Sequence, residues 1–446
     1  MKLTVIGAGG IRMPLFVRSL LRRVERGAAI KEFALTDIRP DRLEVMGRLT
    51  RHLVNQAGDP FDVTVTENLD EALTGAQAVV TTIRPGFEQG RITDEVICKN
   101  ASILGQETVG AGGFAMTARS VPDLLHICKR TRAVADNARI LNFTNPAGMV
   151  TQALHDAGYD EVVGICDSAD NVKDYVALSY DVDVHRIRTR VFGLNHLSAT
   201  MQVWIDDEDV TEKLMNDDAF LEKWFGIFGI DLVRTLGAFP NEYLYYYLLP
   251  SKAVPAMLNE SETRGQKVLK LTEAFFAKVG KLEPEALLAH HADCIGKREA
   301  SYMEYAWKDT DGKQRPDHHL AEGEGYAGVA LDVLEASTQQ AGEIALSMPN
   351  RGAVHWLAHH DVVEITCRVD ADGITPIAPP HVPPRLEALV REVKIFETLT
   401  VLALRHQSKR AAMWALSAHP LVGFHSSAEK VFAKFAAAHE TIGALQ

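Results

Sequence analysis

Residues 3–12 of the chain read LTVIGAGGIR, a short apolar run that passes directly into a glycine-rich turn. Residues 15–24 follow with the spacing of an amphipathic helix. This order of strand, glycine turn and helix is typical of a dinucleotide site, because glycines let the backbone approach a pyrophosphate at the amino end of a helix. The alternative is a glycine-rich turn that binds nothing. We predict a dinucleotide site whose turn residues are Gly7, Gly9, Gly10, Ile11 and Arg12.

A second predicted strand, residues 32–35, ends at Thr36 and Asp37. An acidic residue at this point is well placed to bind the ribose hydroxyls of NAD, and its charge would repel the additional phosphate of NADP. We therefore predict NAD as the cofactor. The alternation continues with a helix over 39–57, a strand over 62–66, a helix over 69–73 and a strand over 78–83, which predicts a parallel sheet.

Three short signatures follow predicted strands further along the chain. They are LNFTNPA at 141–147, GICDS at 164–168 and FGLNHL at 192–197. Ligands of open α/β sheets bind at the carboxyl ends of the strands, so Cys166 and His196 are candidates for one site, where they could share a metal ion. Asn145 should lie beside them. The usual alternative for an isolated cysteine is a small buried hydrophobic residue.

Two further segments have compositions that suggest a ligand. Arg84 and Arg91 follow the strand at 78–83 and could clamp an anion, although they could equally belong to a solvated loop. Residues 105–113, GQETVGAGG, are too rich in glycine for a regular element and suggest backbone that packs close to a ligand. A helix is predicted over 120–134.

Beyond about residue 200, longer helical patterns replace the alternation, over 210–221, 267–279, 327–345 and 385–404. We predict a two-domain α/β protein, with a Rossmann-type, mostly parallel sheet in residues 1–197 and a helix-rich α+β domain in 198–446 for substrate binding and oligomerisation. Residues 240–247, PNEYLYYY, form either an aromatic interface or a site with a phenol as base, whose pKa nearby positive charge would have to lower. Further polar candidates are Arg264, Glu322, Glu324 and Tyr326.

Composition excludes several classes of function. The net charge of -12 argues against a general nucleic-acid or anionic-membrane binder. No apolar run approaches the roughly 20 residues that span a bilayer, and the chain begins directly with a strand pattern, so we expect a cytoplasmic protein. The five cysteines lie far apart, which indicates neither a disulfide framework nor a structural zinc site.

With these motifs the chain resembles the NAD-dependent glycoside hydrolases of family four, the 6-phospho-glucosidase and α-galactosidase group. The resemblance is carried by residues 7–10, 105–108, 142–149, 164–166, 193–196 and the tyrosine run. It implies the fold of the lactate and malate dehydrogenase superfamily. A malate-type dehydrogenase is the competing enzyme, and a catalytically silent NAD-binding regulator is the alternative from another class.

The resemblance also implies a mechanism. Bound NAD⁺ would oxidise the sugar at C3, a manganese ion held by Cys166 and His196 would polarise the sugar oxygens, and Tyr243 would remove the C2 proton. The leaving group would depart by elimination, water would add, and NADH would return the hydride. Ordinary glycosidases use two carboxylates instead. Asn145 and Asn195 are predicted to contact the substrate.

The chain departs from the family pattern at three places. Its opening turn is GAGGIR rather than Gly-Gly-Gly-Ser, so Arg12 could add charge there. An aspartate at the position of Asp167 is typical of α-specific members, where it acts as leaving-group acid. The sequence around Asp167 is closer to that of β-specific members. Residues 322–326, EGEGY, replace an arginine-containing run, which leaves Arg84, Arg91 and Arg264 to bind a 6-phosphate.

The expected function is therefore hydrolysis of 6-phospho-β-glucosides. The alternatives within the family are a 6-phospho-α-glucosidase and a glycosidase for an unphosphorylated or acidic sugar. The resemblance implies a homodimer or homotetramer.

Overall fold

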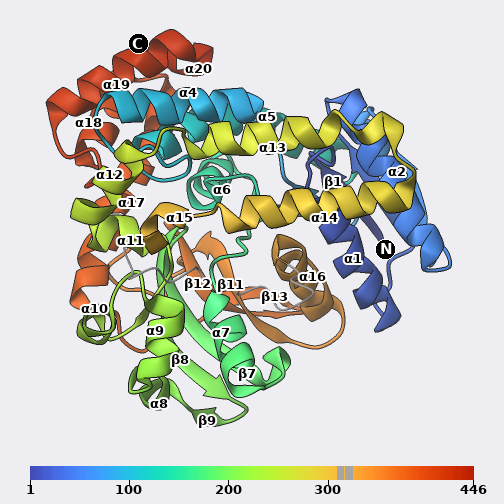
Figure 1. Ribbon diagram of the computed structural model, residues 1–446, viewed down its shortest axis with the longest axis horizontal. Coiled ribbons are helices and arrows are strands. Elements are labelled where there is room, and N and C mark those ends of the chain that lie inside the picture. The colour runs from blue at the N-terminus through green and yellow to red at the C-terminus, as the bar shows by residue number, and fades with distance from the viewer. Residues whose placement is uncertain (309–315, 317–324) are drawn as a thin grey trace.

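The computed structural model describes residues 1–308, 316 and 325–446, and these form helices on both faces of one 13-stranded sheet (Figure 1). The strands lie in the order β10-β8-β7-β12-β11-β6-β5-β4-β1-β2-β3, with β13 beside β12 and β9 beside β8. Glu322 and Glu324, two candidates from the sequence, lie outside the described residues. None of the described helices is both long and apolar enough to cross a membrane.

One half of the sheet is parallel and has the strand order 3-2-1-4-5-6 of a Rossmann fold. The side chains of its central strands, for example Val79, Val80, Ile140 and Leu141, are fully buried, because helices cover both faces. The fold class predicted from the sequence is confirmed. The parallel strands are β1 (Lys2–Ile6), β2 (Glu32–Thr36), β3 (Asp62–Val65), β4 (Ala78–Thr81), β5 (Arg139–Asn142) and β6 (Val162–Gly164).

The other half is antiparallel and is joined to the first where β11 pairs with β6. Strands from the second half of the chain therefore extend the sheet of the first half. The antiparallel strands are β7 (Ile187–Leu194), β8 (Leu197–Ile205), β9 (Glu208–Asp209), β10 (Phe239–Pro240), β11 (Gly342–Pro349), β12 (Val362–Asp370) and β13 (Gly373–Pro376).

The helices of the first half pack around the parallel strands. They are α1 (Met13–Glu25), α2 (Pro40–Gln56), α3 (Leu69–Leu73), α4 (Phe87–Asn100), α5 (Gly110–Val134), α6 (Ala147–Asp156) and α7 (Asn171–Tyr180), with the 3-10 turn η1 (Val184–Arg186) before β7.

The helices of the second half include α13 and α14, which run side by side across the upper part of the view in Figure 1. The first group is α8 (Thr211–Met215), α9 (Asp218–Phe225), α10 (Ile230–Leu236), α11 (Leu244–Leu248), α12 (Pro250–Asn259), α13 (Arg264–Phe276), η2 (Val279–Lys281) and α14 (Pro284–Ala300). The second is α15 (Glu304–Lys308), α16 (Gly325–Thr338), α17 (Pro384–His406), α18 (Lys409–Ala418), α19 (His425–Ala438) and α20 (Glu440–Gly443).

Three predictions of local structure were wrong. The helix expected over 327–345 ends at Thr338, and β11 begins at Gly342, because an apolar run buried on both faces has no period that separates strand from helix. The helix expected over 210–221 is divided between α8 and α9. Residues 110–113, expected to be irregular, form the first turn of α5, where a Cβ on Gly112 would lie 2.1 Å from the Gln106 carbonyl oxygen.

The division at residue 197 stays a prediction. Residue 197 is the first residue of β8, in the β7–β8 hairpin, and the sheet is shared by both parts of the chain.

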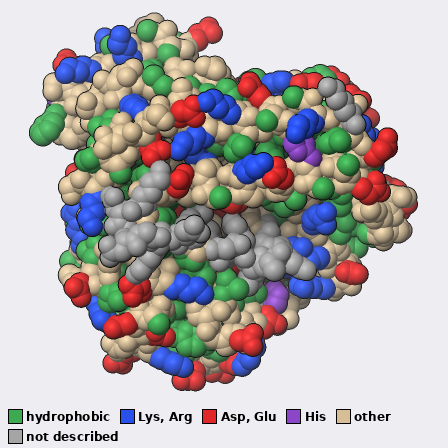
Figure 2. Space-filling view, in the orientation of Figure 1, with side chains coloured by type: hydrophobic (Ala, Val, Ile, Leu, Met, Phe, Trp, Pro, Cys, Tyr) green, Lys and Arg blue, Asp and Glu red, His purple; other side chains and the backbone are tan. Residues whose placement is uncertain are grey.

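Charged side chains of both signs are spread over the face shown in Figure 2, so the net negative charge is not gathered there.

The β7–β8 hairpin depends on Gly193, whose φ of +153° and close contacts exclude a side chain. A Cβ at this position would lie 2.2 Å from the Leu197 carbonyl oxygen. We expect Gly193→Ala to lower the free energy of unfolding by about 2 to 4 kcal/mol through steric strain. Urea denaturation followed by circular dichroism measures this change.

Gly296 is the control, because it lies in α14 and a Cβ there meets nothing within 4 Å. Gly296→Ala should raise stability by about 0.5 to 1 kcal/mol. Equal stability of Gly193→Ala and the wild type would show that the hairpin accommodates a side chain at Gly193.

Candidate active site

A cavity of about 2140 Å³ lies at the carboxyl ends of the parallel strands and is bounded on the other side by residues of α13 and α14. It brings together residues that are far apart in the sequence, as the strand-end rule predicts. Asn195 is not among the residues that line it. The predicted residues in its lining are Gly7, Gly9, Gly10, Ile11, Arg12, Asp37, Arg84, Arg91, Asn145, Cys166, Asp167, His196, Tyr243, Arg264 and Tyr326.

The glycine turn is packed against the ends of β2 and β4. Gly7 has a φ of +93°, and a Cβ on it would lie 2.5 Å from the carbonyl oxygen of Thr82. Asp37 accepts hydrogen bonds from the backbone amides of Gly9 and Arg39, each at 2.8 Å. The carboxylate at the end of β2 is therefore held directly beside the turn, as a dinucleotide site requires.

Cys166 and His196 meet in the cavity. Cys166 follows β6 and His196 lies in the β7–β8 turn, and Sγ is 3.6 Å from Nε2. Both residues are buried. Burial raises the pKa of the Cys166 thiol and lowers the pKa of His196 to about 3, so the imidazole is neutral.

Hydrogen bonds fix the tautomer of His196. The Thr108 hydroxyl donates to Gln106 Oε1 at 3.0 Å, and its oxygen lies 2.7 Å from His196 Nδ1. Because the hydroxyl proton is already used, the oxygen accepts a hydrogen bond from Nδ1–H. The lone pair of Nε2 then faces Cys166, which is the arrangement of a histidine ligand for a metal. Residues 105–108 therefore support the imidazole.

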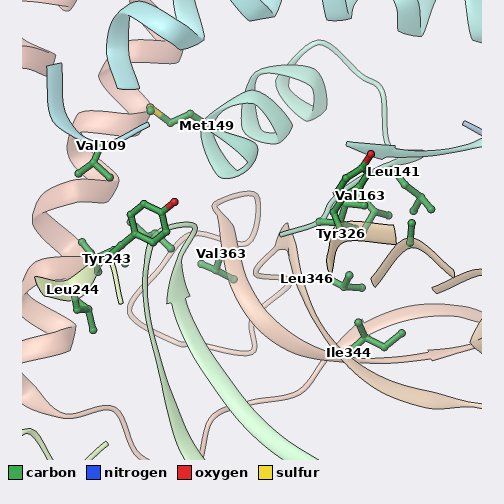
Figure 3. Packing of buried hydrophobic residues seen from close by; sticks show 14 of the residues in the cluster. Val109, Leu141, Met149, Val163, Tyr243, Leu244, Tyr326, Ile344, Leu346 and Val363 are labelled. Atoms are coloured by element: carbon green, nitrogen blue, oxygen red, sulfur yellow. The ribbon is translucent and has the colours of Figure 1, made fainter. Parts of the chain in front are cut away.

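Tyr243 stacks on His196, with the two ring centroids 3.8 Å apart. Figure 3 shows its ring among buried hydrophobic residues, including Val109 and Leu244. Burial and the nearby Glu242 raise the pKa of Tyr243 well above its usual value. A phenol in this setting becomes a base only when positive charge is added close to it.

Five arginines lie around one part of the cavity: Arg12, Arg84, Arg91, Arg264 and Arg298. The first three form salt bridges with carboxylates. Arg84 and Arg91 both pair with Glu107, and Arg91 also bonds to Glu95 at 2.7 Å. The two arginine charges lower the pKa of Glu107 to about 2, although burial opposes this. The predicted arginines of the 84–91 segment thus enter a charge network with Glu107, in which Arg91 is largely buried and Arg84 is half-exposed.

Arg298 was missed by the sequence analysis. It lies on α14 and donates to the Thr272 hydroxyl at 3.0 Å, and the neighbouring Arg264 donates to Ser301 and to the Arg298 carbonyl. Neither has a carboxylate in hydrogen-bond contact among the described residues. Burial and the charges of the other arginines lower the pKa of Arg298 to about 9. A lone arginine in a polar helix carries no sequence signal, since only the fold brings these side chains together.

Arg12 links two carboxylates across the cavity. Its Nη1 lies 3.0 Å from Asp167 Oδ2, and its Nη2 lies 3.0 Å from Glu299 Oε1. Asp167 keeps its expected place next to Cys166, but one of its oxygens is engaged by this guanidinium. Action as a leaving-group acid would have to use Oδ1, or Oδ2 after Arg12 has moved away from it.

The two predicted asparagines take different positions. Asn145 lines the cavity, and its Oδ1 is buried without a hydrogen-bond partner. Asn195 points behind the site, where Nδ2 donates to Glu364 Oε1 at 3.1 Å. Oδ1 of Asn195 is likewise buried without a hydrogen-bond partner, so Asn145 differs from it in lining the cavity, and Asn195 braces the turn that carries His196.

Comparison with known proteins identifies the family. The model of the family 4 glycosyl hydrolases matches residues 2–182, and the model of their C-terminal domain matches residues 191–422. The chain belongs to this family, which confirms the resemblance read from the motifs.

Curated relatives include both anomeric types. A probable 6-phospho-β-glucosidase of Bacillus subtilis is 28% identical over 99% of this chain and 96% of its own length. A phospho-α-glucosidase of Clostridium acetobutylicum is 26% identical over 92% of both chains. The crystal structure of the 6-phospho-β-glucosidase of Thermotoga maritima, which contains manganese, NAD⁺ and glucose-6-phosphate, has a TM-score of 0.83, 25% identity, and coverage of 99% of this chain and 98% of its own.

The hydrogen-bond chain from Gln106 predicts the protonation of the His196 ring. We expect Thr108→Val to remove the acceptor of Nδ1–H, so that the proton distributes between both ring nitrogens. Long-range nitrogen–proton NMR correlations of histidine-labelled protein report the tautomer. Thr131→Val, in which a buried hydroxyl bonded to Ile127 is lost, is the matched control. A pure Nδ1–H tautomer in Thr108→Val would contradict the assignment.

Proposed function

We propose that this chain hydrolyses 6-phospho-β-glucosides with NAD and a divalent metal ion, preferably manganese. The observation that carries the proposal is the buried pair of Cys166 and His196, 3.6 Å apart and stacked against Tyr243 in the dinucleotide-lined cavity of a family 4 chain.

The thiol and imidazole fit a metal ion. Sulfur and nitrogen ligands of zinc lie about 2.3 and 2.1 Å from the ion, and a separation of 3.6 Å between Sγ and Nε2 suits two ligands of one ion. The described residues contain no group of three or more His, Cys, Asp and Glu side chains for a metal. The oxygens that manganese prefers would therefore come from substrate and water.

The dinucleotide turn also fits its ligand. The turn 7–12 precedes α1, and the carboxylate of Asp37 lies beside Gly9, so the turn and the acidic group line one groove. The backbone N–H groups of residues 7–10 donate to acceptors within the protein. When bound, NAD⁺ supplies a reversible hydride acceptor and the cation supplies a Lewis acid beside the sugar.

The chain's own residues then have separate roles. Tyr243 accepts the proton from C2 of the sugar. Its contact with His196 would place the phenol beside the metal ion, whose positive charge its function requires. The amide of Asn145, which lines the cavity, contacts a sugar hydroxyl. The family resemblance implies both roles, and the positions of Tyr243 and Asn145 in the cavity support them.

The sugar phosphate is assigned to Arg264 and Arg298. They are the two arginines of the cluster that no described carboxylate pairs with, and burial together with the neighbouring positive charges lowers the pKa of Arg298. An anion placed between them would relieve this repulsion. Arg84 and Arg91 support the site through Glu107.

Action on the α anomer is the second candidate. It is favoured by Asp167 next to Cys166, a residue that the resemblance associates with α-specific members. The ion pair of Asp167 with Arg12 is the observation against it.

The proposal extends to assembly and location. Five free cysteines support a cytoplasmic location. The exposed apolar side chains of Ile395, Leu402 and Trp414 on α17 and α18 support a homodimer or homotetramer. Residues 1–197 would bind the nucleotide, and residues 198–446 would complete the substrate site and form subunit contacts.

Hydrolysis of p-nitrophenyl 6-phospho-β-glucoside with NAD⁺, manganese and a reductant tests the function. We expect nitrophenol release that stops when NAD⁺ or the metal is removed and that is slower with the α anomer and with the unphosphorylated sugar. Steady accumulation of NADH would indicate a dehydrogenase instead. Tight NAD binding without turnover of any glycoside would indicate a regulator.

Arg298→Met tests the phosphate assignment. The loss of a charge-assisted contact should raise KM for the phosphorylated substrate by about 10- to 100-fold. Turnover of the unphosphorylated glucoside should not fall. The matched control is Lys297→Met, an exposed neighbour on α14 that pairs with Asp293 and should change KM by less than about twofold. Equal losses on both substrates would place Arg298 outside the phosphate site.

A further inference from the structure

The turn that carries His196 is an unusual piece of backbone. Leu194 pairs with Leu197, so Asn195 and His196 are the two central residues of a tight hairpin turn. His196 has a φ of +63°, a conformation that residues other than glycine rarely adopt without support from their surroundings. Its ring contacts Thr108 and Tyr243, but these contacts do not hold the backbone of the turn.

A buried carboxylate from the other end of the chain holds this backbone. Glu364 lies on β12, opposite Gly193 of β7, and is 1% exposed. Its Oε1 accepts a hydrogen bond from Asn195 Nδ2 at 3.1 Å, and its Oε2 accepts one from Ser198 Oγ at 2.7 Å. The two donors lie on either side of His196 in the sequence.

The carboxylate forms no salt bridge with a described basic side chain. Burial raises the pKa of Glu364 to about 7, while the hydrogen bonds from Ser198 and Asn195 oppose the shift. A carboxylate buried in this way destabilises a protein unless its hydrogen bonds compensate. Both of its hydrogen bonds go to the hairpin, so its contacts serve this turn alone.

We propose that Glu364 is a positioning residue that holds the turn 195–198, and through it the imidazole of His196, at the distance from Cys166 that metal binding requires. The inference rests on the proposed metal site. It gives β12 a function in the site. The sequence does not indicate this function, because Glu364 lies far from the motifs of residues 1–197.

The test measures metal affinity directly, without substrate. Manganese binding to the NAD-loaded, reduced protein is titrated by electron paramagnetic resonance for the wild type, Glu364→Gln, Glu364→Leu and Ser198→Ala. Changes to groups that orient a metal ligand typically weaken affinity about 10- to 100-fold. We expect that range for Glu364→Leu. Smaller losses are expected for Glu364→Gln, which keeps an acceptor for Ser198, and for Ser198→Ala, which keeps the Asn195 contact.

Asp94→Asn is the matched control. Asp94 is equally buried and pairs with Arg119 and His439, none of which belongs to the hairpin, so its replacement should lower Tm and leave the manganese Kd unchanged. A general loss of stability is thereby separated from a change of the site. If Glu364→Leu does not fold, Glu364→Gln and Ser198→Ala decide the question.

The inference is overturned if every folded variant binds manganese within about twofold of the wild type, a change far below that expected for an orienting group. Absence of manganese binding by the wild type would overturn the proposed metal site as well, so the two failures are distinguishable.

Discussion

The contact between β6 and β11 is the constraint on which the rest of the structure depends. It joins the parallel half of the sheet to the antiparallel half through a single register pair, Gly164 with Ser347. A Cβ on Gly164 would lie 2.7 Å from both the Ser347 Cβ and the Thr151 hydroxyl oxygen. Only glycine allows this approach, and Cys166 follows two residues later. The position of the thiol is therefore set at the junction of the two half-sheets.

The same junction determines where the imidazole lies. Because β11 pairs with β6, β12 with β11 and β7 with β12, the turn of the β7–β8 hairpin is brought to the end of β6. The thiol and the imidazole of the proposed metal site thus come from two segments that the strands of residues 342–370 join into one sheet. The hairpin turn also lies against Thr108 and close to Gly148 of α6.

This arrangement explains what the sequence could predict. The parallel strands, the glycine turn and Asp37 follow local patterns, and the strand-end rule was sufficient to expect Cys166, His196 and Asn145 in one cavity, whereas Tyr243 was expected there from the family resemblance. The rule concerns strand ends and is independent of strand order, so these expectations did not need the complete topology. The expected reaction came from the family resemblance, because hydrophobic periodicity predicts helices and strands but no chemistry.

Features that depend on long-range pairing were beyond the sequence. β11 was read as helix because its residues are apolar on both faces, and without it the role of β12 could not be seen. Arg298 and Glu364 belong to this group. Glu364 bonds to side chains more than a hundred residues away, and Arg298 is brought beside Thr272 and Arg264 only by the packing of α13 and α14. For Arg12, the sequence indicated a cation beside the cofactor but could not reveal its two carboxylate partners.

Electrostatics connects the three central groups. Burial raises the pKa of Cys166 and Tyr243 and lowers that of His196, so a thiol, a phenol and a neutral imidazole are enclosed together without net charge. Neutral groups are far less costly to bury than a preformed thiolate or phenolate. A cation bound between sulfur and nitrogen would reverse this preference at Cys166 and, through the stacked ring, would favour the phenolate of Tyr243. Desolvation thus disfavours the charged forms of both groups, and the proposed action of Tyr243 as a base would depend on the metal.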